Sequence, residues 1–332
     1  MEENVNSIFR SVPGKAWSAL LLLPVLAFIF LPGCGKTPKE APETAVSKTD
    51  DGDADLVIAL LPERNVFEQK IKYLPMQSYL SERLELNVYF KLLDNYEHIF
   101  AEILDGRVDG GFWGSMNGAI TQARGGVEML ARPVWKDNVS TYWGYVFSLA
   151  DSGIDQDPRT WKGRSIAFVN RATTAGFLYP MSLLREAGIT ADPADYFSKP
   201  IFSGSHDAAI IAVLQGEVEM GACKNTIYQE FMDRNPELVS RFRIISTSPK
   251  VPSNGLGVRP GLDENLKRRL KEVLVAMHED PKGKKVLSDF GALKFIETSY
   301  EDYAPVFDMA EKAAIDLKDW PLRDVRDARP YR

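Results

Sequence analysis

Four short loops in the sequence gather side chains that can donate hydrogen bonds to a small anion. They are Trp113-Gly114-Ser115, residues 170–176 (NRATTAG), residues 203–207 (SGSHD) and Lys224-Asn225-Thr226. Each precedes a segment with the apolar pattern of a helix, and the first turn of a helix exposes unpaired N–H groups and a partial positive charge. Hydroxyl, imidazole and amide groups beside such turns suit a tetrahedral oxyanion.

Two of the loops carry the strongest candidates. Thr173 and Thr174 place two hydroxyls at the start of a predicted helix, and His206 places an imidazole at the start of another. We interpret all three as donors to the anion. Asp207 would accept a hydrogen bond from a protonated oxygen of the ligand, which favours a hydrogenphosphate-like species over sulfate. The alternative is that a threonine and Ser205 only cap the two helices.

The other two loops and one nearby aromatic complete the predicted site. Trp113 is interpreted as a wall of the cleft, Ser115 as a donor and Tyr142 as a phenol that approaches from the hinge side. Lys224 adds a cation and Asn225 an amide. Core packing is the alternative for both aromatics, and a solvated surface position is the alternative for the lysine.

The composition excludes several classes of protein. The chain has 332 residues, of which 45% are hydrophobic and 26% charged, so it is a globular protein of about two domains. A net charge of −6 opposes nucleic-acid binding. The three histidines are far apart, there are two cysteines, and the sequence lacks HExxH, CxxC, GxGxxG and P-loop motifs. We therefore predict no metal or cofactor site, and binding is favoured over catalysis.

The N-terminal segment reads as an export signal. Residues 16–30 (AWSALLLLPVLAFIF) are uncharged, follow Arg10 and Lys15, and end at Leu31-Pro32-Gly33-Cys34. The apolar run is shorter than the roughly 20 residues of a membrane-spanning helix. The tetrapeptide resembles a bacterial lipobox, which implies cleavage before Cys34 and lipidation of that residue. The alternative is an uncleaved anchor, and both interpretations place the body outside the cytoplasm. In the first, the lipid attaches the protein to a membrane.

Between this signal and the body lies a polar stretch. Residues 35–54 (GKTPKEAPETAVSKTDDGDA) have Val46 as their sole large aliphatic residue and no aromatic. Such a segment cannot bury enough apolar surface to fold. We therefore divide this end of the chain into a signal peptide at residues 1–33 and, at residues 34–55, a lipidated cysteine with a flexible tether.

The body alternates short apolar runs with helical patterns, which predicts βαβ units and a mainly parallel sheet. The run at residues 56–61 (LVIALL) is typical of a buried parallel strand, and a helix is expected from Pro75 to Leu84. The pattern L-x-G-x-V-[D/E]-x-G begins at both Leu104 and Leu214. Its glycine can end a helix with a positive φ, and its valine can begin a strand. We interpret the repeat as one βαβ unit in each of two lobes. The alternative is that both copies only reflect a sequence pattern that commonly ends helices.

Two crossings between the lobes are expected, near residues 145–153 and near residues 247–257. The second coincides with a stretch rich in proline and glycine. The predicted first lobe therefore comprises residues 56–148 and 249–332, and the second comprises residues 149–248. Two crossings between α/β lobes make a hinge beside a cleft. The tail from Lys318 has no assigned role.

The order of the loops resembles the phosphate, phosphite and phosphonate-binding proteins of ABC importers, the PhnD-like family. The resemblance covers residues 56–300 and depends on residues 172–176 (ATTAG) and residues 204–208 (GSHDA) at this spacing. It implies a two-lobed periplasmic-binding-protein type II fold in which Thr173, Thr174, His206 and Asp207 contact a tetrahedral head group. It also implies a permease and an ATPase as partners of a monomeric binding protein that uses no cofactor.

Two departures from the family pattern narrow the expected ligand. Ala175 stands where the family commonly has a third hydroxyl, and the loop at Lys224 has no acidic residue for the ammonium of an aminoalkylphosphonate. Phosphate, phosphite or a simple alkylphosphonate is therefore favoured. One alternative is an oxyanion sensor that presents its ligand to a histidine kinase, with Cys223 as a soft ligand for arsenite. A hydrolase with His206 as base and Asp207 as its orienting partner is the other.

Overall fold

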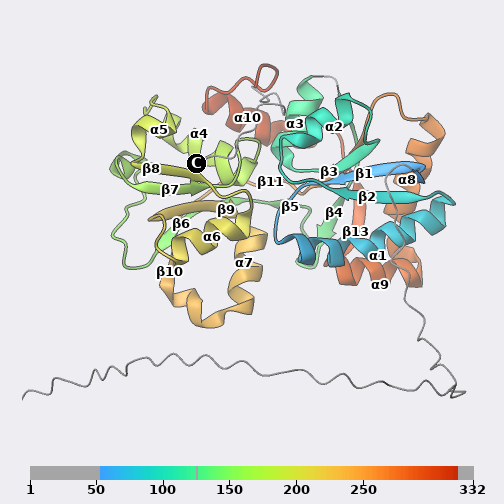
Figure 1. Ribbon diagram of the computed structural model, residues 1–332, viewed down its shortest axis with the longest axis horizontal. Helices are drawn as coiled ribbons and strands as arrows, with labels where there is room; N and C mark the ends of the chain where they lie inside the picture. The colour runs from blue at the N-terminus through green and yellow to red at the C-terminus, as the bar shows by residue number, and fades with distance from the viewer. Residues whose placement is uncertain (1–52, 125, 321–332) are drawn as a thin grey trace, which may run out of the picture. The chain divides into compact units, whose positions relative to one another are not determined.

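The computed structural model describes residues 53–124 and 126–320 (Figure 1). The predicted signal peptide, Cys34, almost all of the tether and the last part of the C-terminal tail lie outside the described residues. Within the described ranges, no helix combines the length and the apolar character needed to cross a membrane.

Six strands form the first sheet, in the order β13-β4-β12-β3-β1-β2. The central strand β1 pairs in parallel with β2 and β3, as its continuous apolar sequence predicts, and the other strands join antiparallel. The strands are β1 (Leu56–Leu60), β2 (Val88–Leu92), β3 (Gly110–Trp113), β4 (Glu128–Trp135), β12 (Gly255–Val258) and β13 (Ala292–Glu297).

Five strands form the second sheet, in the order β10-β6-β9-β7-β8. Here β7 pairs in parallel with β8 and β9, while β6 and β10 are antiparallel. The parallel triplets β3-β1-β2 and β9-β7-β8 therefore have the same order in the two sheets. The strands are β6 (Gly144–Leu149), β7 (Ser165–Phe168), β8 (Lys199–Phe202), β9 (Met220–Lys224) and β10 (Phe242–Thr247).

Helices cover the sheets and form the connections (Figure 1). Alternate residues of β1 pack into two separate cores: Val57 and Ala59 face the side of α2 and α3, and Ile58 faces the side of α1, α8 and α9. The helices are α1 (Val66–Leu84), α2 (His98–Leu104), α3 (Ser115–Ala123), α4 (Tyr179–Glu186), α5 (Pro193–Tyr196), α6 (His206–Leu214), α7 (Asn225–Arg234), α8 (Glu264–Ala276), α9 (Pro281–Phe290) and α10 (Ala304–Lys312).

The repeated L-x-G-x-V pattern lies at equivalent places in the two sheets. Gly106 follows α2 with φ +67°, and Gly216 follows α6 with φ +73°. Both backbones are in the left-handed region that favours glycine. The chain then enters β3 in the first sheet and β9 in the second. The repeat thus contributes one βαβ ending to each sheet, as interpreted from the sequence.

The predicted start of α1 at Pro75 is wrong. The helix begins at Val66, where the side chain of Asn65 accepts a hydrogen bond from Phe67 N at 3.0 Å. Pro75 lies inside the helix, where it removes the hydrogen bond to the carbonyl of Ile71. Ile71 lies on the exposed face, so water can satisfy that carbonyl.

A two-stranded ribbon joins the sheets. Strand β5 (Thr141–Tyr142) pairs antiparallel with β11 (Val251–Pro252), and the chain leaves the first sheet along β5 and returns along β11. The outward crossing comes earlier than predicted, because β6 already pairs with β9 and β10. Residues 144–148, which the prediction placed with the first lobe, thus belong to the second sheet. Helix α10 packs against both α3 and α4 (Figure 1), so the C-terminal segment contacts both lobes.

Candidate ligand-binding site

The loops that follow the parallel strands of the two sheets contact one another. After β1, the carbonyl of Glu63 accepts a hydrogen bond from His206 N, after β8, at 3.3 Å. The backbone N–H of Asn65 donates to Asp207 Oδ2 at 3.0 Å. Ligands of α/β proteins bind at this end of the strands, so the contact region is the natural place for a site.

Polar side chains gather in this region, and we refer to them as the interlobe cluster. Every parallel strand of the two sheets supplies one member from the loop or residue at its carboxyl end, and the hinge ribbon and the segment after it supply two more. The members are Glu63, Tyr96, Ser115, Tyr142, Thr174, His206, Lys224 and Asn254.

Lys224 is the cation of the interlobe cluster. It is the last residue of β9, is 3% exposed, and its Nζ lies 3.0 Å from Glu63 Oε1 and 3.1 Å from Asn254 Oδ1. The same ammonium lies 4.5 Å from the ring centroid of Tyr142. Burial opposes ionisation of Glu63, but the nearby ammonium of Lys224 outweighs burial, and the pKa of Glu63 falls to about 2. A buried ion pair thus links the two lobes.

His206 is a neutral donor in this environment. Its Nδ1 accepts a hydrogen bond from Lys224 N at 3.1 Å, which places the proton of the ring on Nε2. Burial lowers the pKa of His206 to about 4, although the carboxylate of Glu63 opposes the shift. The imidazole therefore presents an N–H without a positive charge, which is compatible with the donor role predicted from the sequence.

The depressed pKa of His206 makes stability depend on pH. An unfolded histidine binds a proton below its ordinary value of 6.5, whereas the folded one stays neutral to about 4. The contribution of His206 to the unfolding free energy is therefore complete above pH 6.5. It is lost as the pH drops toward 4, a change of about 3 kcal/mol. Urea titrations between pH 7 and pH 5 should show the slope, and H206N should remove most of it.

A matched substitution separates this effect from general acid sensitivity. His98 lies outside the interlobe cluster beside Asp94, so H98N should retain the slope. The stability that Glu63 contributes is lost only as the pH falls from 4.5 toward 2, so it adds little to the slope in the tested range. Equal slopes for H206N and the unmodified protein would contradict the assignment.

Tyr142 brings the hinge into the cluster. Its hydroxyl lies 3.1 Å from Ser115 Oγ, which is also 2.6 Å from the carbonyl of Pro252. Burial raises the pKa of Tyr142 to about 12, although the nearby hydroxyls of Ser115 and Thr174 oppose the shift. The phenol therefore keeps its proton at neutral pH and joins both lobes to the hinge.

Two buried hydroxyls of the cluster lack hydrogen-bond partners. Among the described residues, Thr174 Oγ1 and Tyr96 OH make no hydrogen bond, and neither atom is accessible to solvent. The Tyr96 phenol lies close enough to Glu63 and Tyr142 for their charges to raise its pKa, after burial, which is the largest cause. A buried hydroxyl without a partner is costly, so such groups call for an explanation in a native fold. Donors held for an anion provide one.

Thr173 uses its hydroxyl within its own loop. Its Oγ1 donates to the carbonyl of Asn170 at 2.6 Å. Thr174 is therefore the threonine of the pair whose hydroxyl makes no hydrogen bond among the described residues, and it lies near the hydroxyl of Tyr142. Gly176 is required by close packing here, because a Cβ at this position would lie 2.5 Å from Val169 Cβ and 2.8 Å from Thr173 Oγ1.

Three other predicted site residues are engaged elsewhere. Trp113 is fully buried in the core, where its indole N–H donates to Gly257 O at 3.0 Å and its ring packs near Phe100, so it does not wall a cleft. Asn225 accepts a hydrogen bond from Trp143 N at 2.9 Å and thereby fixes the entry into β6. Asp207 accepts hydrogen bonds from Asn65 N and from Ala208 N, so its carboxylate is directed to the edge of the cleft and not toward Thr174.

Cys223 does not contribute to the site. Its side chain is fully buried in the core, and burial raises the pKa of the thiol well above its ordinary value. Neighbouring residues of a strand point to opposite faces, so Lys224 reaches the cluster while Cys223 faces away. The arsenite alternative required this thiol as a soft ligand, and the structure removes that support.

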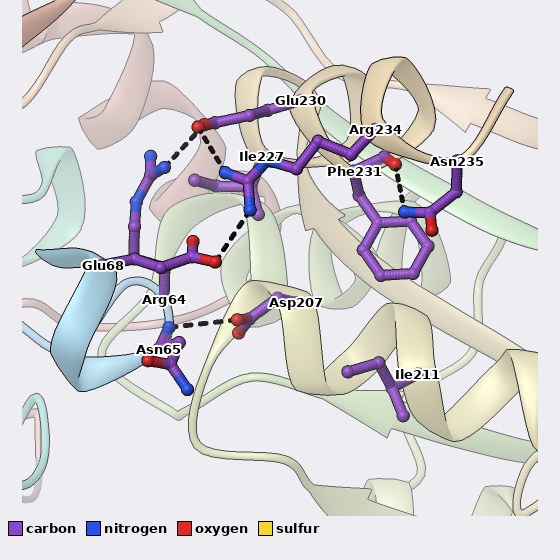
Figure 2. Close-up of a pocket in the computed structure, with 10 residues that line it drawn as sticks. All are labelled: Arg64, Asn65, Glu68, Asp207, Ile211, Ile227, Glu230, Phe231, Arg234 and Asn235. Atoms are coloured by element: carbon purple, nitrogen blue, oxygen red, sulfur yellow. Dashed lines mark hydrogen bonds and ion pairs between the residues drawn. The ribbon is translucent and has the colours of Figure 1, made fainter.

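A chain of ion pairs connects the two lobes at the rim of the cleft, as Figure 2 shows. Arg64 in the first lobe pairs with Glu230 of α7 at 2.6 Å, and Arg234 pairs with Glu68 of α1 at 2.8 Å and with Glu230 at 2.7 Å. A pocket of about 250 Å³ lies among them and includes Asp207. The lobes are therefore in contact in this structure, with the cluster behind the rim.

Sequence reasoning missed several members of the cluster. No role is predicted for Glu63 or Tyr96, and Asn254 lies in the stretch interpreted as a crossing between the lobes. A signal existed for Glu63, since it follows the first buried strand as Lys224 follows β9. A pocket of about 610 Å³ includes both Glu63 and Lys224 and opens beside the cluster.

Two α/β lobes, joined by a paired hinge ribbon and meeting over a buried polar cluster, have the architecture of solute-binding proteins of the periplasmic type. A model of the family described as "ABC transporter, phosphonate, periplasmic substrate-binding protein" matches residues 58–303. The chain belongs to this family, whose members are binding proteins of transporters and not enzymes. The hydrolase alternative also lacks its geometry, because His206 and Asp207 contact different partners.

Curated relatives agree with this family. The phosphate-import protein PhnD of Mycolicibacterium smegmatis is 26% identical over 193 residues, covering 56% of this chain and 60% of its own length. A probable phosphite-binding protein, PhnD1 of Prochlorococcus marinus, is 28% identical over 160 residues, covering 46% and 52%. The chain thus spans between half and two thirds of these two relatives.

Solved structures share the fold. PhnD1 of Prochlorococcus marinus in complex with methylphosphonate superimposes with a TM-score of 0.68 at 21% identity, covering 78% of this chain and 98% of that one. A binding-protein component of an ABC phosphonate transporter from Pseudomonas aeruginosa gives a TM-score of 0.71 at 19% identity, covering 78% and 86%. The predicted two-lobed periplasmic-binding-protein fold is therefore confirmed.

Proposed function

We propose that this protein captures a small phosphorus oxyanion between its lobes and delivers it to the permease and ATPase of an ABC importer. Phosphate, phosphite and simple alkylphosphonates are the proposed ligands. The observation that carries the proposal is the pair of buried hydroxyls without partners, Thr174 Oγ1 and Tyr96 OH, in a cluster that also holds a neutral imidazole and an ammonium.

This arrangement suits a tetrahedral anion for physical reasons. Hydrogen bonds to a charged acceptor are about twice as strong as those to a neutral acceptor. Exclusion of water strengthens them again, because the local dielectric constant is lower. Thr174, Tyr96 and His206 Nε2 are held in place before the ligand arrives, so binding does not have to order them. Lys224 supplies a positive charge, and closure of the lobes excludes water.

Glu63 takes over the role that the sequence assigned to Asp207. Its carboxylate lies inside the cluster, whereas Asp207 faces the rim. Hydrogenphosphate and monoprotonated phosphonates carry a proton that a carboxylate can accept. Sulfate has none near neutral pH and would face Glu63 with a like charge, so the site should reject it.

We also propose that the protein is held outside the cytoplasm by lipid on Cys34, as a monomer, with residues 35–54 as the tether. The lipobox-like tetrapeptide and the polar composition of that stretch support this. Mass spectrometry of the membrane-extracted protein should show a diacylglyceryl-modified N-terminal peptide beginning at Cys34. An unmodified peptide that begins upstream of Cys34 would contradict it.

Isothermal titration of the purified protein tests the ligand assignment. Phosphate, phosphite or methylphosphonate should bind with a Kd of roughly micromolar or below, because several charge-assisted hydrogen bonds form in a site that excludes water. Sulfate should bind at least about tenfold more weakly, since it lacks the proton that Glu63 accepts. Absence of heat with all three phosphorus anions would overturn the proposed function.

A further inference from the structure

The ammonium of Lys224 occupies a receptor of the kind that proteins build for ligand cations. A carboxylate oxygen of Glu63 lies 3.0 Å away, the amide oxygen of Asn254 lies 3.1 Å away, and the ring of Tyr142 lies 4.5 Å away. A carboxylate, a neutral oxygen and an aromatic face together satisfy charge, hydrogen bonding and cation–π attraction. The three groups come from the first lobe, from the segment after β11 and from the hinge ribbon.

This receptor adjoins the hydroxyls without partners. Thr174 lies beside the hydroxyl of Tyr142, and Lys224 Nζ lies over the ring of the same tyrosine. The backbone of Lys224 also holds His206 through its N–H. Thr174 and the receptor therefore share Tyr142 as a neighbour, so a substituent on a head group bound at Thr174 would be close to the receptor.

We propose that Lys224 fills an ammonium subsite with its own side chain and thereby restricts the ligand to oxyanions whose tail carries no positive charge. The inference rests on the proposed function, since it concerns the tail of the same ligand. An aminoalkyl tail would meet the Lys224 ammonium, and its carboxylate and amide acceptors would already be occupied. A small uncharged tail, or none, meets no such repulsion.

A matched pair of ligands tests the proposal on the unmodified protein. Ethylphosphonate and 2-aminoethylphosphonate share a head group and a two-carbon tail, and they differ in the terminal ammonium. Isothermal titration should give at least about tenfold tighter binding of ethylphosphonate, because a like charge placed against a buried ammonium is strongly unfavourable. Equal affinities, or a preference for the amino compound, would overturn the inference.

The variant K224M opens the subsite. Methionine keeps an unbranched stem and removes the charge, so Glu63 and Asn254 become free to hold an ammonium. Binding of 2-aminoethylphosphonate should tighten by at least about tenfold relative to the unmodified protein, while ethylphosphonate should weaken because the site loses a positive charge that attracts the anion. In K224M/E63Q the gain for the amino compound should disappear, since its carboxylate partner is absent.

The control is K250M. Lys250 also lies over an aromatic ring, 5.7 Å from that of Trp143, but it is exposed and outside the cluster. This variant should keep the ligand preference of the unmodified protein. The thermal shift produced by 2-aminoethylphosphonate gives a second readout for K224M, because a ligand ammonium should stabilise a protein whose Glu63 has lost its partner.

The possible results distinguish failure of the proposed function from failure of the ammonium-subsite inference. If the unmodified protein binds neither ethylphosphonate nor any of phosphate, phosphite and methylphosphonate, the proposed function fails and the inference fails with it. If it binds both phosphonates equally well, the function stands and the inference is overturned. If K224M folds, binds ethylphosphonate and shows no gain for the amino compound, the ammonium subsite is also overturned.

Discussion

Replacing Thr174 by valine is expected to weaken methylphosphonate binding by roughly 10- to 100-fold, as the loss of one hydrogen bond to a charged group implies. The same change should leave the unfolding free energy unchanged or slightly raised. Thr174 Oγ1 is buried and makes no hydrogen bond among the described residues, although it lies near the Tyr142 hydroxyl, so the unliganded fold gains little from it. Valine keeps the shape of threonine and removes the hydroxyl, and titration calorimetry with urea unfolding measures both effects.

Substitution of a threonine with a structural role should instead lower stability and leave binding unchanged. Thr298 is buried, and its Oγ1 contacts Arg132 and Asp302 outside the cluster. T298V should lower the unfolding free energy by about 1 kcal/mol and leave binding intact. Wild-type affinity in T174V would show that this hydroxyl does not meet the ligand.

The pair formed by Glu63 and Lys224 should have the largest effect on stability. E63Q leaves the Lys224 ammonium buried without a carboxylate, and loss of one partner from a buried ion pair typically costs about 3–5 kcal/mol. The exposed fraction of the Glu63 side chain is 15%, so some solvent screening remains and we expect the lower end, about 3 kcal/mol. Urea unfolding at pH 7 measures this cost.

A double-mutant cycle isolates the interaction. K224M should also destabilise, and K224M/E63Q should be much more stable than the sum of the single losses predicts, with a coupling of about 2 kcal/mol or more. Lys271 and Glu297 form an exposed pair at 3.2 Å in the first lobe and provide the control. Their cycle should give less than about 1 kcal/mol. Additive losses at Glu63 and Lys224 would contradict a functional ion pair between the lobes.

Local sequence was sufficient to locate most of the loops that hold the donors. Hydroxyl and imidazole residues directly follow apolar strands, and glycines at Gly106 and Gly216 mark where helices end and strands begin. These signals act over a few residues, so the sequence could point to the loops of Thr174, Ser115 and His206, which all reach the interlobe cluster. The predicted donor role of Ser115 is not supported, because its hydroxyl donates to the carbonyl of Pro252. The order of the two parallel triplets then follows from the repeated βαβ units.

Contacts between the lobes could not be predicted in this way. Glu63 and Lys224 meet across 161 positions of sequence, and no local pattern specifies such a pair. His206 and Asp207 are adjacent at the start of α6, where successive side chains diverge, so one enters the cluster and the other turns to Asn65. Trp113 ends a strand that the first sheet buries on both faces, which sends its indole into the core.

A crystal structure of the protein with methylphosphonate tests the central claim most directly. We expect phosphonate oxygens within about 3 Å of Thr174 Oγ1 and Tyr96 OH, the distance of a hydrogen bond, with His206 Nε2 as a further donor. The rim pocket in Figure 2 offers a competing place for an anion, since Arg64 and Arg234 line it. Methylphosphonate bound there, with Thr174 and Tyr96 still lacking partners, would contradict the account.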